Sequence, residues 1–328
     1  MPYFSVIIPT RNRPDVLSVA LNSVLAQSFE DYEIVIVDDG SDVPITLQQL
    51  QLEFDPGPAV RIVHLSSQVR GRGPGYARNI GVWASKGSYC AFLDDDDSWS
   101  KTEHLSDARA AIEGCEHSPD LYLANQEAYG ADGVAKRLWL YPAVALLEQL
   151  NRALLNGVYS VAAEELISVG GFCHLNTTIV KREFFDSLGG LDEYLAYEED
   201  LDFYLRAIDT ARHIIFSPDI VARHNIPDKR AKTNASTALS ALNKLNIRLF
   251  LLNKNLFIAR HQSIADFCRE YSVSTTKHIV QQYVNAESYS LAYQFAMRAL
   301  GARLSLKWFV YCGYLRFKAW KGSSRKDE

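Results

Sequence analysis

The chain has 328 residues, of which 48% are hydrophobic and 22% are charged, and its formal net charge is −5. This is the balance of a globular protein with enough apolar material for one large core or two smaller ones. The negative net charge gives no general support to a nucleic-acid-binding function. Five widely spaced cysteines without a CxxC pair predict reduced packing residues rather than a disulfide framework or a zinc site.

The sequence gives no sign of a membrane-spanning segment. No run approaches the roughly 18 uninterrupted apolar residues that a spanning helix needs. Residues 1–5 lack the basic region and long apolar segment of a signal peptide. We therefore expect a cytoplasmic protein, either soluble or bound peripherally at the inner face of the plasma membrane.

From residue 4 to about residue 224, short β-branched runs alternate with helical segments, which predicts a mostly parallel sheet flanked by helices. Helices are predicted over residues 14–27, with a proline in the first turn and Val16 on the apolar face, and over residues 76–85. Ligands in such α/β sheets bind beyond the carboxyl ends of the strands. The predicted strands are residues 4–9, 33–38, 60–65, 88–94 and 121–129.

The first two strand ends carry polar residues. Residues 9–14, Pro-Thr-Arg-Asn-Arg-Pro, lack the glycine-rich turn of a dinucleotide-binding protein, which counts against a Rossmann dehydrogenase. After the second strand, Asp38 and Asp39 precede Gly40. They could accept hydrogen bonds from a base or a ribose, or they could simply form a capped Asp-Gly turn.

A flexible basic loop, residues 71–75, then leads into a helix with Arg78 in its first turn. A helix N-terminus of this kind favours anions. The loop therefore fits a diphosphate contact, although a plain surface loop would have the same composition.

The fourth strand runs into four consecutive aspartates, Asp94 to Asp97. Two unit charges about 4 Å apart repel by roughly 4 kcal/mol at an effective dielectric near 20. Such a cluster needs a cation, and an oxygen-rich site suits Mg²⁺ or Mn²⁺, whose remaining positions are commonly filled by water and substrate phosphates. The strand end is therefore predicted to hold a phosphorylated substrate.

Three further features lie later in the chain. Gly189 and Gly190 precede the pair Glu199-Asp200, which begins a segment of helical apolar spacing. A carboxylate there is stabilised by the helix dipole without any catalytic role, so the pair alone leaves both interpretations open. His224 closes the α/β region, where it is either structural or a metal ligand.

Residues 5–10, 36–41, 77–79, 92–97 and 199–200 form an ordered set, SVIIPT, IVDDGS, ARN, FLDDDD and ED. The set resembles glycosyltransferase family 2, inverting enzymes of the GT-A fold, over roughly residues 3–225. The resemblance implies a GT-A catalytic domain over residues 1–227, with a nucleotide-sugar half of about 1–100 and an acceptor half of about 101–227. Residues 228–328 would form a helical C-terminal module.

The resemblance also implies roles for individual residues and for a Mn²⁺ or Mg²⁺ cofactor. Asp200 would be the catalytic base, Asp96 and His224 would bind the metal, and Asp97 fits the family's acidic tetrad. Gly189, Gly190 and Glu199 would lie on the acceptor side. The residues expected to bind the nucleotide-sugar are Pro9, Thr10, Asp38, Asp39, Arg78, Asp94 and Asp95.

The implied function is transfer of a sugar from a nucleotide-sugar, with UDP favoured, to a hydroxyl of a glycan or lipid-linked acceptor in surface polysaccharide synthesis. A sugar nucleotidyltransferase is one alternative, but it would carry a glycine-rich loop after the first strand. A non-catalytic nucleotide-binding scaffold is another, and it would not need the intact acidic set.

After residue 227 there is no proline or glycine until Gly301, and leucines recur at helical spacing from Leu239 to Leu256, which predicts a helical module. Residues 304–321 form a basic, aromatic segment. It is either a terminal helix docked on the core or a helix in contact with a membrane interface. The segment contains Trp308, Phe309, Tyr311, Tyr314, Phe317 and Trp320 together with Lys307, Arg316, Lys318 and Lys321.

Overall fold

The computed structural model describes residues 1–66, 71–130, 132–137, 139–226 and 239–323. The chain divides into two units, Met1–Asn234 and Ala235–Glu328. The predicted domain boundary between residues 227 and 228 lies outside the described residues. The division of the first unit into a nucleotide-sugar half and an acceptor half also stays a prediction.

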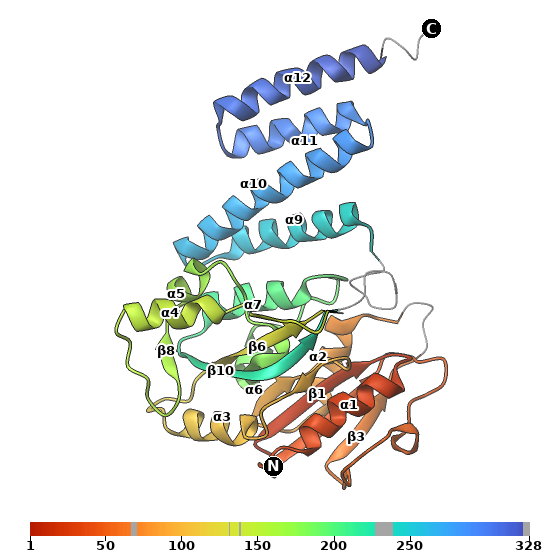
Figure 1. The fold of residues 1–328 in the computed structure, drawn as a ribbon, viewed down its shortest axis with the longest axis vertical. Helices are drawn as coiled ribbons and strands as arrows, with labels where there is room; N and C mark the ends of the chain where they lie inside the picture. The colour runs from red at the N-terminus through yellow and green to blue at the C-terminus, as the bar shows by residue number, and fades with distance from the viewer. Residues whose placement is uncertain (67–70, 131, 138, 227–238, 324–328) are drawn as a thin grey trace. The chain divides into compact units, whose positions relative to one another are not determined.

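The first unit is built on a mixed sheet with the strand order β3-β2-β1-β4-β9-β6-β10-β5, with β7 paired to β6 and β8 paired to β10 (Figure 1). Strands β3, β2, β1 and β4 are parallel neighbours, and β6 is parallel to β10. Strand β9 is antiparallel to both β4 and β6 and joins the two parallel groups. The strands are β1 (Phe4–Thr10), β2 (Tyr32–Asp38), β3 (Val60–His64), β4 (Tyr89–Phe92), β5 (Ser98–Trp99), β6 (Leu121–Tyr129), β7 (Ala135–Arg137), β8 (Tyr159–Val161), β9 (Thr178–Lys181) and β10 (Ile214–Asn225).

All five predicted strands are present, but β4 is shorter than predicted. The strand ends at Phe92 rather than at residue 94. Leu93 still donates its N–H to the carbonyl of Ile7, and the chain then turns, with a hydrogen bond of 3.1 Å from the Asp97 N–H to the Asp94 carbonyl. Because aspartate is depleted in strands and common in turns, the four aspartates form a turn beyond the strand.

Helices cover both faces of the sheet, and two 3₁₀ turns, η1 (Leu47–Gln49) and η2 (Leu175–Thr177), lie between them. Prolines occupy the first turns of the two helices that were predicted. Val16 was wrongly assigned to a buried face: it is 38% exposed, and the neighbouring Leu17 is buried instead. The helices of this unit are α1 (Pro14–Leu25), α2 (Pro74–Ala84), α3 (His104–Glu113), α4 (Tyr141–Gln149), α5 (Ala163–Ser168), α6 (Arg182–Ser187) and α7 (Glu199–Thr210).

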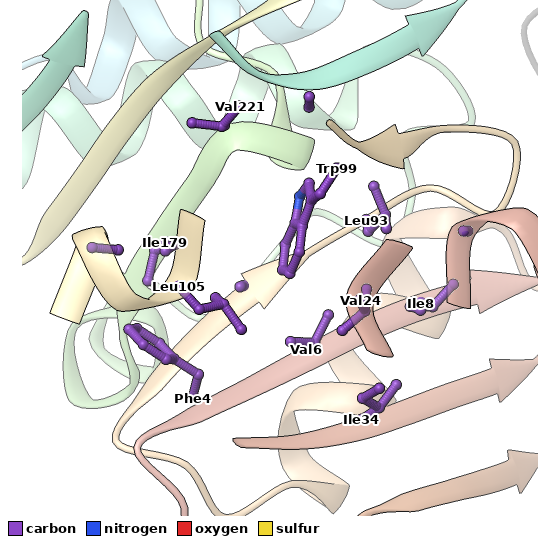
Figure 2. Packing of buried hydrophobic residues seen from close by; sticks show 14 of the residues in the cluster. Phe4, Val6, Ile8, Val24, Ile34, Leu93, Trp99, Leu105, Ile179 and Val221 are labelled. Atoms are coloured by element: carbon purple, nitrogen blue, oxygen red, sulfur yellow. The ribbon is translucent and has the colours of Figure 1, made fainter. Parts of the chain in front are cut away.

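Alternate residues of the central strands pack against different helices. On one face, Phe4, Val6 and Ile8 of β1 belong to a buried cluster with Val24 of α1 and Leu105 of α3 (Figure 2). On the other face α2 lies so close that a Cβ at Gly81 would collide with Ile7. The aromatic series Phe92, Phe185 and Phe203, with ring centroids 5.9 and 5.5 Å apart, brings α6 and α7 against the same face. This packing fixes the carboxyl ends of β1, β2 and β4 at one edge.

The second unit is helical, as predicted, and consists of α9 (Ala241–Ile258), α10 (Gln262–Asn285), α11 (Tyr289–Ala302) and α12 (Leu306–Ser323). Its core joins α10, α11 and α12 through a cluster that includes Val280, Ala296 and Leu315. Among the described residues of the chain, no helix has the length and apolar character needed to cross a membrane. The five cysteines are all free, and four of them are buried, which confirms their predicted packing role.

Candidate active site

Beyond the carboxyl end of β1, an arginine contacts two of the four aspartates. Thr10 donates its hydroxyl to Asp95 at 2.7 Å. Arg13, which immediately precedes α1, forms a bidentate ion pair with the buried carboxylate of Asp95 and donates to Asp96 at 3.0 Å. Arg13 was not among the predicted site residues. It neutralises part of the repulsion within the acidic turn.

The two aspartates after β2 hold neighbouring backbone. Asp38 accepts hydrogen bonds of 3.0 Å from the N–H groups of Ser41 and Ile45. These bonds lower the pKa of Asp38, although burial alone would raise it. Asp39 accepts from the N–H groups of Arg72 and Gly73 at 2.9 Å. Asp38 therefore caps a turn and Asp39 holds the basic loop, while base recognition by either residue stays a prediction.

Arg78 links three elements of the site. Its buried guanidinium donates through Nη2 to Asp94, beyond β4, and through Nη1 to Glu199, in the first turn of α7, at 2.8 Å. Its Nε has no hydrogen-bond partner among the described residues. The structure thus shows Arg78 holding two carboxylates in place, and a direct diphosphate contact stays a prediction.

Gly189 and Gly190 form the turn after α6 with positive φ angles of 74° and 71°. A Cβ at Gly190 would approach the Asn79 Oδ1 to 2.6 Å, which explains why this position is glycine. Asn79 exchanges two hydrogen bonds of 2.9 Å with the backbone of Leu191. The glycines therefore let the loop close against α2, and a role on the acceptor side stays a prediction.

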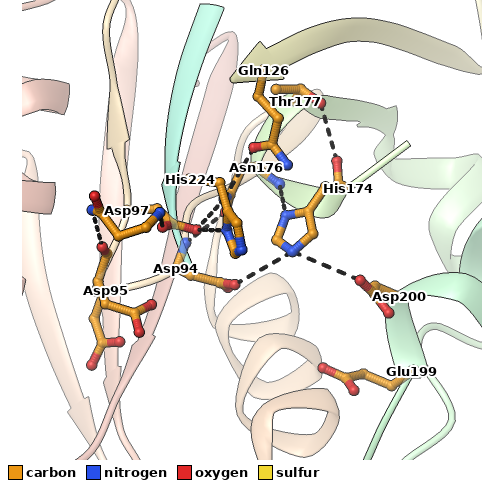
Figure 3. A network of polar contacts seen from close by, with 12 residues as sticks. Asp94, Asp95, Asp97, Gln126, His174, Asn176, Thr177, Glu199, Asp200 and His224 are labelled. Carbon is orange, nitrogen blue, oxygen red and sulfur yellow. Dashed lines mark hydrogen bonds and ion pairs between the residues drawn. The ribbon is translucent and has the colours of Figure 1, made fainter. Parts of the chain in front are cut away.

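Asp200 and Asp94 face one another across His174 (Figure 3). The His174 Nε2 lies 3.9 Å from the Asp94 Oδ2 and 3.8 Å from the Asp200 Oδ2. Burial raises the pKa of Asp200 to about 6. Burial would also raise the pKa of Asp94, but the charge of the Arg78 guanidinium and its hydrogen bond outweigh this effect and lower that pKa to about 2. The two carboxylates thus have different environments and different proton affinities.

The hydrogen bonds of His174 indicate which ring nitrogen carries its proton. The His174 Nδ1 accepts from the Asn176 N–H at 3.3 Å, so the proton of the neutral ring lies on Nε2 and points toward Asp94 and Asp200. Burial lowers the pKa of His174, which favours this neutral form. The Nε2–H of His174 therefore faces the two carboxylates at 3.9 and 3.8 Å, beyond hydrogen-bonding distance, and this nitrogen has no lone pair ready for a metal.

His224 has the opposite arrangement. Its Nδ1 lies 2.7 Å from the Asp97 Oδ2, and a carboxylate partner places the proton on Nδ1 and leaves a lone pair on Nε2. Burial would lower the pKa of His224, but its bond to Asp97 raises it. Asp97 is buried and also accepts from the Asn225 N–H and the Asn176 side chain. Asp97 therefore orients His224, as carboxylates that are hydrogen-bonded to metal-binding histidines commonly do.

The chemistry of this edge fits a divalent cation. Ligand atoms of Asp94, Asp97 and His174 lie within 4.8 Å of one another. Asp97 and His174 are already engaged in the hydrogen bonds described above. Asp94 and the His224 Nε2 are therefore the better electron-pair donors to a metal. Asp96 lies outside that group and is paired with Arg13, so its role as a metal ligand stays a prediction. The site contains six carboxylates, from residues 94–97, 199 and 200, against the two arginines Arg13 and Arg78. A Mg²⁺ or Mn²⁺ ion would offset the excess negative charge.

His174, Asn176 and Arg13 were missed by sequence reasoning. Each is a single polar residue outside the recognised motifs, and its partners are distant in sequence: 82 residues separate Arg13 from Asp95, and 79 separate Asn176 from Asp97. The proline that follows Arg13 was the one available signal, because it predicts a helix start and so places Arg13 at the carboxyl end of the first strand.

Comparison with known proteins gives a consistent family. Residues 5–153 match the family described as glycosyl transferase family 2. The amylovoran biosynthesis glycosyltransferase AmsB of Erwinia amylovora is 28% identical over 210 residues, which are 62% of this chain and 63% of the relative. The poly(ribitol-phosphate) beta-N-acetylglucosaminyltransferase TarS of Staphylococcus aureus is 33% identical over 151 residues, 45% of this chain and 25% of the relative. The chain thus spans less than two thirds of the length of these relatives.

Solved structures share the fold. S. aureus TarS 1-349 in complex with UDP-GlcNAc has a TM-score of 0.62 at 19% identity, over 97% of this chain and 88% of that one. The mannosyltransferase PcManGT from Pyrobaculum calidifontis, in complex with GDP-Man and Mn²⁺, has a TM-score of 0.58 at 16% identity, over 98% and 86% of the two chains. At these identities the likeness establishes the architecture of the chain and nothing finer.

Proposed function

Because this chain belongs to glycosyl transferase family 2 and has the GT-A fold, we propose that it is an inverting, metal-dependent glycosyltransferase. It would transfer a sugar from a nucleotide-sugar to a hydroxyl of a glycan or lipid-linked acceptor. The observation that carries this proposal is the placement of a buried carboxylate of raised pKa, Asp200, across His174 from the acidic turn. A base and a cation-binding group thus lie on opposite sides of one imidazole.

In the proposed reaction Asp200 takes the proton of the acceptor hydroxyl while that oxygen attacks the anomeric carbon. The bond from that carbon to the diphosphate oxygen breaks, the nucleoside diphosphate leaves with the electron pair, and the configuration inverts. A base with a pKa of about 6 is mostly ionised at neutral pH and still basic enough to assist. Positioned general bases typically contribute about 10² to 10⁴-fold in rate.

His174 would act as a positioning residue. Its Nε2–H is directed at Asp94 and Asp200 from nearly equal distances of 3.9 and 3.8 Å. At these distances the N–H dipole would stabilise both carboxylates without a direct hydrogen bond, and Trp139 packs edge-on against the ring at a centroid distance of 5.9 Å. The imidazole would therefore keep the base at a constant separation from the phosphate-binding turn.

We propose that Mn²⁺ or Mg²⁺ would be held by carboxylate oxygens of Asp94 and Asp96 and by the Nε2 of His224, with Asp97 orienting His224. When bound, such an ion neutralises negative charge that develops on the departing diphosphate. Arg13 competes for Asp96 through its contact at 3.0 Å and would have to yield part of that contact to the metal.

For the donor we favour a UDP-sugar, because TarS, which shares this fold, has been solved in complex with UDP-GlcNAc and with UDP. GDP-mannose is the second candidate, from the mannosyltransferase. Pro9, Thr10, Asp38, Asp39, Arg78 and Asp95 would contribute to this pocket. The names of the relatives, which include amylovoran and poly(ribitol-phosphate) enzymes, support an acceptor in surface polysaccharide synthesis. A lipid-linked acceptor would place the enzyme at the inner face of the plasma membrane.

The proposal is tested by thermal unfolding of the purified protein with UDP, GDP and dTDP, each with and without Mn²⁺. Ligand present at about 100 times its Kd stabilises the native state by about 2.7 kcal/mol. We expect a metal-dependent shift with one nucleotide, followed by release of that nucleoside diphosphate from its sugar conjugate when an acceptor polysaccharide is added. Binding without release under any acceptor would favour the scaffold alternative, and pyrophosphate formation from a sugar phosphate and a nucleoside triphosphate would favour a nucleotidyltransferase.

A further inference from the structure

Helix α12 has apolar side chains on two opposite faces. One face packs on α11 through the buried residues Cys312 and Leu315, with Trp308 and Tyr311 partly buried beside them. The other face is exposed to solvent. Its apolar residues and their exposed fractions are Leu306 at 80%, Phe309 at 63%, Val310 at 65%, Phe317 at 53% and Trp320 at 67%.

Helical geometry separates these two sets cleanly. An α-helix turns by about 100° per residue, so Leu306, Val310, Phe317 and Trp320, at spacings of four, seven and three, share one stripe. Cys312 and Leu315 lie roughly half a turn away from it. The stripe therefore lies on the solvent side of the helix, and soluble proteins rarely leave so large a continuous apolar surface exposed without an interaction that uses it.

The charge along this part of the chain is entirely positive. Residues 288–323 contain six basic residues and no acidic residue, so the formal charge of −5 combines +6 from this stretch with −11 from the rest. On α12, Arg316 flanks one side of the exposed stripe, and Lys307, Lys318 and Lys321 flank the other. The ammonium groups of Lys318 and Lys321 lie 5.7 and 6.0 Å from the ring centroids of Tyr314 and Phe317. Positive and apolar groups thus alternate over one surface.

A cavity of about 680 Å³ between α10 and α12 opens at the edge of this surface. It is lined by two lysines, Lys277 and Lys307, and by aromatic rings that include Tyr314. Lys277 lies 5.0 Å from the Trp308 ring centroid. The cavity shares Lys307, Val310 and Tyr314 with the border of the stripe, so a small anionic group could enter it while apolar groups cover the stripe.

We propose that the outer face of α12 docks on an anionic phospholipid bilayer. The helix would lie in the plane of the interface, with the stripe in the acyl boundary, the basic side chains at the lipid phosphates, and one headgroup in the lysine-lined cavity. Tryptophan and tyrosine are enriched at this depth of membranes. A second copy of the chain fits less well, because pairing two such faces would oppose their positive flanks. This docking is independent of the proposed catalytic reaction.

The test is flotation of the full chain with vesicles of phosphatidylcholine alone and of phosphatidylcholine with phosphatidylglycerol, without nucleotide or sugar. We expect binding to the anionic vesicles only, weakened by salt. The variant R316Q/K321Q, which removes one charge from each flank, should bind about 25-fold more weakly, at about fivefold for each basic residue. The matched control K86Q/R269Q removes two exposed charges elsewhere and should bind like the wild type.

The apolar stripe is tested by F317S/W320S, for which we expect at least about tenfold weaker binding. Its control is F257S/I258S, which removes comparably exposed apolar residues from α9. Equal binding to both vesicle types, no binding to anionic vesicles, or unchanged binding of F317S/W320S would each overturn the proposal. So would a wild-type dimer in analytical ultracentrifugation that F317S/W320S converts to monomer, because a second copy would then cover the face. D200N should bind vesicles normally, which separates this test from that of the catalytic proposal.

Discussion

The carboxyl edge of the first unit's sheet and the outer face of α12 have opposite chemistry. At the sheet edge, charged side chains are buried, and the strongest contacts join residues distant in sequence, as Arg78 does with Asp94 and Glu199. On α12, large apolar side chains are exposed and only one face of the helix is covered by its own unit. Both arrangements are costly in isolation.

The difference lies in what each region needs in order to work. At the sheet edge, Arg13 and Arg78 already pair with buried carboxylates, so removing one of these internal partners should disturb geometry and stability. The stripe on α12 is largely exposed to solvent, so its substitutions should change association and leave folding intact. Predictions about the sheet edge can therefore separate residues that react from residues that only hold others in place.

Asp200→Asn should have the largest effect on activity. The amide has nearly the same shape but cannot accept the acceptor's proton, so we expect kcat to fall about 10² to 10⁴-fold. Nucleotide affinity should be unchanged within about twofold, measured by calorimetry with Mn²⁺. Asp209→Asn, near the other end of α7, is the matched control and should retain kcat. Wild-type turnover in Asp200→Asn would remove this residue from the mechanism.

Arg78→Met should have the largest effect on stability. It would leave Asp94 and Glu199 as buried carboxylates without their shared cation, which typically costs about 3 to 5 kcal/mol. Urea unfolding would measure this loss. Arg61→Met is the control, since Arg61 is 39% exposed and pairs with Glu33 at 3.2 Å, a kind of pair worth less than about 1 kcal/mol. Equal losses in the two variants would contradict the holding role of Arg78.

A titration should distinguish Asp200 from Asp94. Burial raises the pKa of Asp200 to about 6, so this base becomes protonated as the pH falls through 6. The value of kcat/KM should then fall about tenfold per pH unit below 6. Asp94, whose pKa is lowered to about 2 by Arg78 against the effect of burial, stays ionised across this range. If the Asp200→Asn variant keeps enough residual activity for a pH profile and its acidic limb is unchanged, that limb belongs to another group.

The fold could be predicted where the pattern is local and repeated. Residues 121–129 form β6 as predicted, and the proline-initiated helices α1 and α2 are present. The short strands β5, β8 and β9 could not be predicted, because two to four residues carry no periodicity. Strand β9 is held by pairing with β4 and β6, both distant in the chain, so its existence depends on tertiary structure.

The same limit applies within the site. Asp94 to Asp97 and the pair Glu199-Asp200 stand out because acidic residues cluster in the sequence. His174 follows Cys173 in a segment with no motif, and nothing local distinguishes it from a structural histidine. Its position between Asp94 and Asp200 arises only when the turn beyond β4 and the start of α7 are brought together. A residue whose role is to hold two others is visible only after both are placed.

His174 should therefore show a small and specific effect. His174→Ala removes the Nε2–H but leaves Asp200 able to accept a proton. We expect kcat to fall at most about fivefold, because a polar contact longer than a hydrogen bond should contribute no more than the roughly 1 kcal/mol of one hydrogen bond. His174→Gln can present an N–H at a similar place and should recover most of this loss. The KM for the donor should change less than kcat in both variants. If Gln and Ala were equally impaired while both remained folded by circular dichroism, the donor role of the Nε2–H would be wrong, and packing against Trp139 would be the better explanation of His174.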